Sequence, residues 1–336
     1  MVLLFLLLLP TSTNSHFVQS PSASIQPVSS EQNNELQLNC GRVGGSKKIG
    51  LNKIDFGDLA RPGQFPWAAA LETTDGKRLC SASVISSRHV LTVAHCVLDT
   101  EKCIECMNGR KTENDEYEYS NANKTSDQST WIIAYGGHCN TVGVTKLDDN
   151  CQQDNMKRVG VRAIAWDERY ANFCAHYDMA IVELEREIQF DFEFGSILPI
   201  CLAHPSFPYN GSILTFFGFG SVAEDNDAET RSSYSQLRYG VSPHYWTMRD
   251  GSEMTFDYRL SRNESERLNQ PFLPRSQLAR GDSGGGLSTT GCDGSTLLIG
   301  TITQSSKNTT QSYASVLATH IDEICTLTGV CPIDRC

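Results

Sequence analysis

The chain has 336 residues, of which 39% are hydrophobic and 20% charged, and its formal net charge is −11. This length is enough for one large domain or two ordinary domains with a substantial core. The negative charge argues against nucleic acid or an anionic membrane surface as the main partner.

The first residues form an unbroken apolar run, MVLLFLLLLP, which is followed by the small polar residues TSTNS. The run is shorter than the ~20 apolar residues that a membrane-spanning helix needs, so it predicts a secretory signal peptide, assigned to residues 1–15. No later segment has enough consecutive apolar residues to span a membrane. We therefore expect a secreted, extracellular protein without a membrane partner.

Residues 16–53 are rich in Ser, Gln and Asn and contain few large apolar side chains. Such a composition is typical of a propeptide or a linker. The remaining residues, 54–336, are expected to form the folded domain.

Short segments rich in β-branched and aromatic residues follow, and Gly, Asn, Asp and Ser separate them. They predict strands at 80–96, 131–137, 158–166, 178–184, 212–220, 296–303 and 312–317. Between them, residues 101–130 are polar and acidic and predict a surface loop insertion. Near the end, 318–327 has apolar residues at helical spacing and predicts a helix. So many short strands indicate an all-β fold of barrels or sandwiches.

Thirteen cysteines fit an oxidising compartment, where they predict a disulfide framework that leaves at least one cysteine over. Sequons of the form N-x-S/T predict N-glycosylation at Asn123, Asn210, Asn263 and Asn308.

Metal binding is the alternative for part of this cysteine set. Cys103 and Cys106 have the spacing of half a zinc site, but no second pair matches it, so disulfides to Cys139 or Cys151 are favoured. The acidic stretch 113–118 could collect Ca²⁺, although a solvated face explains it better. No metal and no other cofactor is expected.

Three motifs carry the chemistry: LTVAHC with His95, DMAIVEL with Asp178, and GDSGGGL with Ser283. A serine hydroxyl becomes a good nucleophile when a histidine takes its proton. A carboxylate on the other ring nitrogen then holds the histidine tautomer and stabilises the imidazolium. The glycines beside Ser283 permit a sharp turn that aims the Gly281 and Ser283 N–H groups at a developing oxyanion.

In the order His, Asp, Ser, these motifs resemble the chymotrypsin/trypsin-like serine endopeptidase family. The stretches RPGQFPWAAAL, LCSASVISSRHVLTVAHC, ILPICL and FFGFG extend the resemblance over about residues 54–325. It implies two six-stranded antiparallel β-barrels of the trypsin-like type, a C-terminal helix, and an active site between the barrels. It also implies a Cys80–Cys96 disulfide beside His95, and a Cys40–Cys201 disulfide that keeps the propeptide attached.

Members of this family are cut before an Ile or Val, whose new α-amine pairs with the Asp preceding the nucleophile, here Asp282. The family places that residue twelve positions before the Pro of its Pro-Trp pair. Counted from Pro66, the resemblance predicts activation at Lys53-Ile54. It thereby rejects two nearby basic sites, Lys48-Ile49 and Arg42-Val43.

The expected specificity pocket departs from the tryptic pattern. Gln277 stands where family members that cut after Lys or Arg carry Asp, and Gln lacks the charge to hold such a side chain. The pocket-wall segment Ser-Trp-Gly of the family is replaced by Thr303-Gln304-Ser305. These changes predict a small, apolar or amide-bearing side chain at P1, the residue whose carbonyl is attacked.

The main alternative to an endopeptidase is a catalytically silent homologue that acts as a binding or regulatory module. The altered pocket and Asp55, which replaces an apolar residue of the family pattern, favour it slightly, whereas the intact triad favours the enzyme. A lipase or esterase is excluded by motif order, because those enzymes place Ser before Asp and His. For an endopeptidase the partners are a protein or peptide substrate, an activating protease and, as a further candidate, a protein inhibitor.

Overall fold

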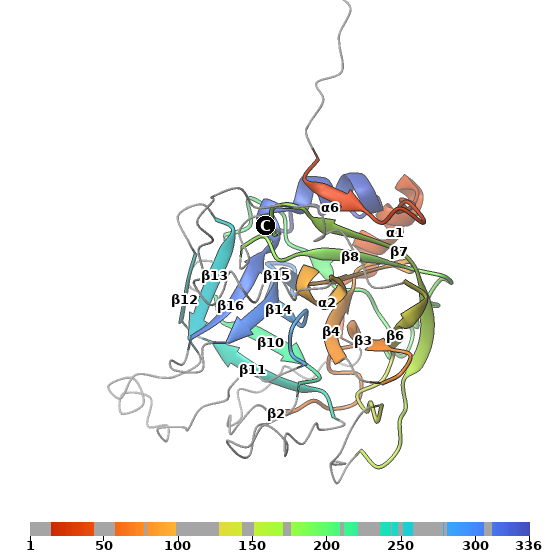
Figure 1. The fold of residues 1–336 in the computed structure, drawn as a ribbon. Helices are drawn as coiled ribbons and strands as arrows, with labels where there is room; N and C mark the ends of the chain where they lie inside the picture. The colour runs from red at the N-terminus through yellow and green to blue at the C-terminus, as the bar shows by residue number, and fades with distance from the viewer. Residues whose placement is uncertain are drawn as a thin grey trace, which may run out of the picture.

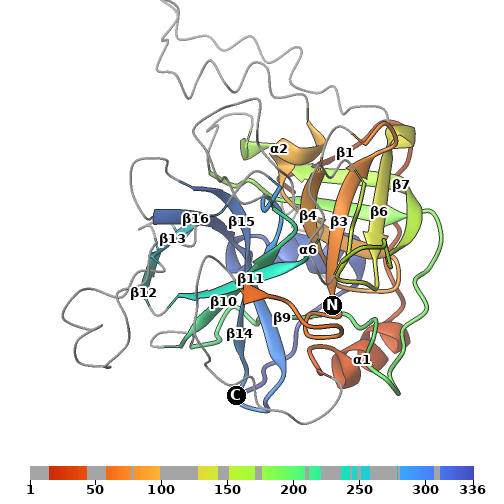
Figure 2. The same ribbon diagram turned by 90° about the horizontal axis from the view of Figure 1, so that it is seen from below.

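The computed structural model describes residues 15–43, 58–76, 79–98, 128–142, 151–170, 176–208, 212–220, 236–242, 244–247, 251–257, 278, 281–305 and 311–336. Its strands form two antiparallel sheets that lie side by side (Figures 1 and 2).

The first sheet closes into a six-stranded barrel. Its strands are β3 (Ala68–Thr73), β4 (Leu79–Val84), β5 (His89–Thr92), β6 (Trp131–Tyr135), β7 (Lys157–Asp167) and β8 (Ala180–Leu184). They follow the order β7-β6-β3-β4-β5-β8, and pairing of β7 with β8 closes the ring. Ile133, Ile164 and Val90 share one face of this sheet and are fully buried, as expected for β-rich segments that fill a barrel core.

The second sheet contains β10 (Leu214–Gly218), β11 (Arg238–Ser242), β12 (His244–Thr247), β13 (Glu253–Asp257), β14 (Gly286–Thr290), β15 (Thr296–Ser305) and β16 (Gln311–Val316). The order of these strands is β12-β13-β16-β15-β14-β10-β11. The two outermost of them, β11 and β12, are consecutive in the sequence and are separated by residue 243 alone. Two short strands extend it: β2 (Asp58–Leu59) pairs with β11, and β9 (Cys201–Leu202) runs parallel to β15.

The helices in the described residues are α1 (Ser30–Asn39), α2 (Ala94–Val97) and α6 (Ile321–Thr328), with short 3₁₀ turns η2 (Gln128–Thr130) and η3 (Leu317–Thr319). α6 ends at Gly329 in the left-handed conformation, the usual way to stop a helix. None of the helices in the described ranges is long and apolar enough to cross a membrane. The predicted all-β class with a C-terminal helix is confirmed. The first sheet is a closed six-stranded antiparallel barrel, and the described part of the second forms a half-barrel, consistent with the expected trypsin-like double barrel.

The N-terminal segment 16–43 is folded onto the first barrel. β1 (Phe17–Gln19) adds an antiparallel strand to β7, and α1 begins with a reciprocal cap between Ser29 and Gln32. Figure 1 shows β1 and α1 on the same side as α6, where the Val28 N–H donates to the Thr328 carbonyl at 2.8 Å.

The composition of this segment resembles a linker, and neither β1 nor α1 was predicted. The structure differs because a few irregularly spaced apolar side chains, including Phe17, Ile25 and Leu36, are buried. Backbone hydrogen bonds also hold this segment on the first barrel, and so does Glu183, whose carboxylate accepts from the Gln26 N–H at 2.8 Å. Neither contribution leaves a hydrophobic pattern in the sequence.

Five disulfides join cysteines of the described ranges: Cys40–Cys201, Cys80–Cys96, Cys139–Cys151, Cys292–Cys336 and Cys325–Cys331. The expectation that Cys103 or Cys106 pairs with Cys139 or Cys151 is wrong, because Cys139 and Cys151 pair with each other. Their short sequence separation of 12 residues closes a local loop. Cys103, Cys106 and Cys174 lie outside the described residues.

His89 on β5 makes the stability of this barrel dependent on pH. Its ring is fully buried, with Nδ1 2.9 Å from the Ser86 hydroxyl oxygen. Burial lowers the pKa of His89 to about 4, although the Glu183 charge raises it. Between pH 6.5 and 4 the unfolded chain therefore binds more protons at this residue than the folded chain does.

We expect this histidine to destabilise the fold by about 3 kcal/mol as the pH falls from 6.5 to 4, and to have no such effect above pH 6.5. Urea unfolding at a series of pH values measures the effect. The His89→Gln variant should lose less stability over the same interval. Parallel curves for the two proteins would show that His89 does not carry this pH dependence.

Candidate active site

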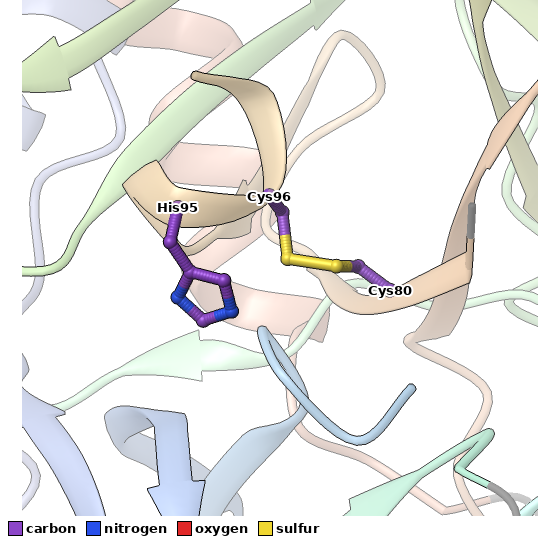
Figure 3. Close-up of side chains that lie close together, drawn as sticks. All are labelled: Cys80, His95 and Cys96. Carbon is purple, nitrogen blue, oxygen red and sulfur yellow. A yellow bond between two sulfur atoms is a disulfide. The ribbon is translucent and has the colours of Figure 1, made fainter. Parts of the chain in front are cut away.

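The register of two strands brings His95 close to Asp178. β5 pairs with β8, with Thr92 opposite Ala180. His95 lies in α2, three residues after Thr92, and Asp178 lies two residues before Ala180. Both side chains therefore leave the barrel from the same corner. The Cys80–Cys96 disulfide ties α2 to β4 (Figure 3).

Asp178 holds His95 at two points. Its Oδ2 is 2.6 Å from His95 Nδ1, and its Oδ1 accepts from the His95 backbone N–H at 3.0 Å. The Asp178 side chain is 4% exposed and the His95 side chain 28%, so the imidazole reaches solvent while the carboxylate does not. Burial alone would lower the pKa of His95, but the charge and hydrogen bond of Asp178 outweigh it and raise this pKa above 6.5.

Ser283 lies in the turn before β14, and the first barrel holds this turn in place. The Ser81 N–H donates to the Ser283 carbonyl at 2.7 Å, and the Ser81 hydroxyl donates to the Gly281 carbonyl at 2.8 Å. Cys96 Sγ is 4.0 Å from the Ser283 carbonyl oxygen. Ser283 therefore lies at the junction of the two sheets, beside the disulfide next to His95.

Gly284 makes this approach possible. Its φ is +82°, and a Cβ there would be 2.1 Å from the Ser81 carbonyl oxygen and from Thr92 Oγ1. A side chain at this position would separate the turn from the first barrel. The glycine-rich motif is thus explained by close backbone packing as well as by the turn itself.

The Ser283 hydroxyl donates to the Thr303 carbonyl at 3.3 Å. Within the described residues, no hydrogen bond joins it to His95. Catalytic hydrogen bonds are often long or absent without substrate and form in the complex. The turn of the expected nucleophile therefore lies against the disulfide next to the expected base, and the Ser283 hydroxyl is bound to Thr303 instead of His95.

Asp282 points away from Ser283, into the second sheet. Its Oδ1 accepts from the Gly220 N–H at 2.8 Å. A Cβ on Gly218 or Gly220 would come within 2.4 Å of the Asp282 side chain, so the FGFG stretch leaves room for this carboxylate. The expected partner, Ile54, lies outside the described residues, as does the Lys53-Ile54 bond.

Of the expected specificity pocket, the structure describes only the β15 side. Thr303 is buried on β15, and its hydroxyl has no hydrogen-bond partner among the described residues. Ser305 ends the same strand, where its backbone pairs with Ser312. Gln277 lies outside the described residues, as do the four sequons at Asn123, Asn210, Asn263 and Asn308.

Two clusters of metal-ligating residue types occur in the described part of the chain. In the first, Cys80 and Cys96 flank His95, but their sulfurs are joined to each other and are not available as thiolate ligands. The second joins Asp167, His320 and Glu323. The guanidinium of Arg169 already binds both Asp167 oxygens and supplies the positive charge there.

Ser81 and Tyr177 were missed by the sequence reasoning. Ser81 binds the carbonyls of Gly281 and Ser283, and its hydroxyl oxygen also accepts from the Phe219 N–H at 2.8 Å. Its position directly after Cys80, one end of the disulfide beside His95, is the only signal in the sequence. Tyr177 precedes Asp178 and has no sequence signal that we can name.

Comparisons with known proteins identify the family of the chain. Residues 17–331 match the nematode trypsin-6-like family. The chain is 28% identical to human atrial natriuretic peptide-converting enzyme over 49% of its own length and 12% of the relative's. It is 23% identical to human transmembrane protease serine 11A over 64% of the chain and 40% of the relative.

Human testisin is 25% identical over 65% of the chain and 58% of the relative. The chain thus spans less than two thirds of the length of each of these relatives. The family match covers nearly all of the chain and includes the N-terminal segment that folds onto the first barrel. The chain belongs to the nematode trypsin-6-like family, within the trypsin-like serine proteases.

Proposed function

We propose that the protein is a secreted serine endopeptidase that cuts peptide bonds through an acyl-enzyme intermediate. The observation that carries the proposal is the Asp178–His95 pair next to the turn of Ser283. Its expected substrate is a protein or peptide, and the precursor needs an activating protease.

The groups present can supply each step of acyl transfer. Ser283 Oγ attacks the scissile carbonyl while His95 takes the hydroxyl proton. Asp178 keeps the Nδ1 proton of His95 in place and stabilises the imidazolium. His95 then gives its proton to the leaving amine, and water activated by the same imidazole releases the acyl group from Ser283.

The oxyanion of this reaction needs backbone donors. Gly281 adopts a φ of +106°, and its N–H, like that of Ser283, donates to no other group in the described part of the chain. Two unengaged donors beside the nucleophile support an oxyanion hole at Gly281 and Ser283.

Activation by cleavage at Lys53-Ile54 is supported by the place of Asp282. A carboxylate held between Gly218 and Gly220 is a suitable partner for an incoming α-ammonium group. Burying such a carboxylate is costly unless a positive charge pairs with it. Before cleavage the pair cannot form, so the uncut chain should lack the contact that stabilises the active arrangement of the Ser283 turn.

The Cys40–Cys201 disulfide predicts that the cut protein remains one covalent unit. After cleavage at Lys53, a non-reducing gel should show one band and a reducing gel two. β1 and α1 should also keep the short chain bound after mild reduction, because they pair with β7 and pack against α6. Release of residues 16–53 without reductant would contradict this arrangement.

The proposed preference for a small, apolar or amide-bearing P1 side chain rests on Gln277, Thr303 and Ser305. A peptide library incubated with the cleaved protein tests both the activity and this preference. We expect cuts that require Ser283 and avoid Lys and Arg at P1. Cleavage mainly after Lys or Arg would overturn the preference while leaving the endopeptidase proposal intact.

A silent homologue that binds a partner is the second candidate. The hydrogen bond of the Ser283 hydroxyl to Thr303 instead of His95 favours it. In that case cleavage at Lys53 should proceed, but Ser283 should stay unreactive towards any acylating reagent.

A further inference from the structure

Tyr177, the residue before Asp178, has an unusual backbone conformation. Its φ is +58°, and within the described part of the chain no other non-glycine residue has a positive φ. For a bulky side chain this left-handed conformation is strained and persists only when the surroundings enforce it.

The strained residue sets the direction of Asp178. The Tyr177 carbonyl accepts from the Met179 N–H at 2.8 Å, so Asp178 is the central residue of a tight turn. The Met179 carbonyl in turn accepts from the Asp167 N–H at 3.1 Å, which fixes the far side of this turn to β7. Because both neighbours of Asp178 are fixed, its carboxylate has little freedom to turn away from His95.

The ring of Tyr177 is clamped between two polar groups. The Cζ atom of Arg169 lies 4.0 Å from the ring centroid, and the ring of His320 meets it nearly edge-on at 6.2 Å. Both partners are fixed by Asp167, which is fully buried. Arg169 binds both carboxylate oxygens of Asp167, and His320 Nδ1 lies 3.0 Å from one of them.

Further contacts hold His320 in place. It is fully buried, its Nε2 is 3.2 Å from the Ser315 hydroxyl oxygen, and Phe17 of β1 packs against it edge-on at 5.9 Å. Glu323 of α6 binds the His16 backbone N–H and lies 3.9 Å from Arg169. The clamp is therefore built from β7, the N-terminal strand and the C-terminal helix together.

We propose that Tyr177 is a positioning residue for the reaction: its clamped ring keeps the backbone left-handed and so aims Asp178 at His95. The rate effects rest on the proposed endopeptidase function, but the contact between Asp178 and His95 does not. The alternative is that Tyr177 only fills space, in which case its removal would lower stability and leave His95 unchanged.

Substitutions at Tyr177 and Arg169 distinguish a positioning role of Tyr177 from a space-filling role. Tyr177→Ala removes the ring, whereas Tyr177→Phe retains the aromatic face under Arg169. Arg169→Lys keeps a positive charge beside Asp167 but loses the planar group over the ring. Arg162→Lys is the matched control: it alters a similar Arg–carboxylate pair on β7, with Glu183, at a site without contact to Tyr177.

The readout is the pH dependence of kcat/KM, whose acid limb reports the pKa of His95 in the free enzyme. Asp178 raises that pKa, so misdirecting its carboxylate should move the acid limb to lower pH. We expect Tyr177→Ala to show this shift with kcat lowered about 10²-fold and KM nearly unchanged. Arg169→Lys should show a smaller shift of the acid limb in the same direction, and Tyr177→Phe should retain the wild-type pH profile.

All measurements are made well below the unfolding midpoint of each variant. A wild-type acid limb and kcat in Tyr177→Ala would overturn the proposal, and so would an equal shift in Arg162→Lys. If the cleaved wild-type protein has no turnover, the endopeptidase proposal fails, and NMR titration of His95 in the same variants replaces kinetics. A lower His95 pKa in Tyr177→Ala alone would then still support positioning, and an unchanged pKa would overturn it.

Discussion

Asp178→Asn is expected to lower kcat of the cleaved protein about 10⁴-fold while the fold is retained. Asp178 holds His95 through Nδ1 at 2.6 Å and through the backbone N–H at 3.0 Å. An amide can keep the second contact, but it cannot stabilise an imidazolium and favours the wrong tautomer of His95. Turnover of a peptide substrate at saturating concentration measures the loss.

Glu72→Gln is the control for this change. Glu72 is a buried carboxylate of the same barrel, bound by Asn140 at 2.7 Å and by Arg158 at 3.1 Å, and it does not contact His95. This variant should lose stability and keep kcat. A loss of kcat in Asp178→Asn no larger than in Glu72→Gln would show that Asp178 is a structural acid only.

Asp282→Asn should leave cleavage at Lys53 normal and still lower kcat about 10²–10³-fold, the size expected when an oxyanion donor is lost. The amide can accept the Gly220 N–H, but it carries no charge to pair with the α-ammonium group of Ile54. N-terminal sequencing confirms the cut, and active-site titration together with peptide hydrolysis measures the result.

Asp293→Asn provides the comparison for Asp282→Asn. Asp293 lies in a turn of the same sheet, where it binds Ser295 and Arg335 and has no contact with the nucleophile turn. Full activity in Asp282→Asn after a verified cut would rule out the proposed pairing. A loss of activity that is equal in both variants would point to general destabilisation of the second sheet.

The strands and the candidate triad could be predicted from the sequence because both depend on local patterns. Alternating β-branched residues predict strands such as β7 and β15, whose bounds follow the segments identified in the sequence. The predicted segment 80–96, in contrast, divides into β4, β5 and the helix α2. The three motifs name His95, Asp178 and Ser283, and the structure brings the first two into direct contact. Their catalytic roles remain a prediction.

The N-terminal segment could not be predicted because its stability comes from tertiary contacts. β1 is a short edge strand that depends on β7 for every backbone pair. α1 buries only Leu36 and Gln37, so it has no amphipathic pattern of its own. The Cys139–Cys151 pair was missed for a related reason, since spacing alone does not fix disulfide connectivity.

Tyr177 was missed because a left-handed backbone is normally predicted from glycine or asparagine, and tyrosine gives no such signal. Its conformation is imposed by Arg169 and His320, which lie 8 residues before it and 143 residues after it in the sequence. Only the structure shows that these distant groups meet beside Asp178.

Fluorophosphonate labelling of the purified precursor, before and after trypsin treatment, tests the central claim most directly, with N-terminal sequencing of the products. The account predicts labelling of Ser283 that appears only together with a new terminus at Ile54. A clean cut at Lys53 without labelling of Ser283 would contradict the enzyme and favour the silent binding module. Equal labelling of the uncut chain would contradict the proposed activation switch.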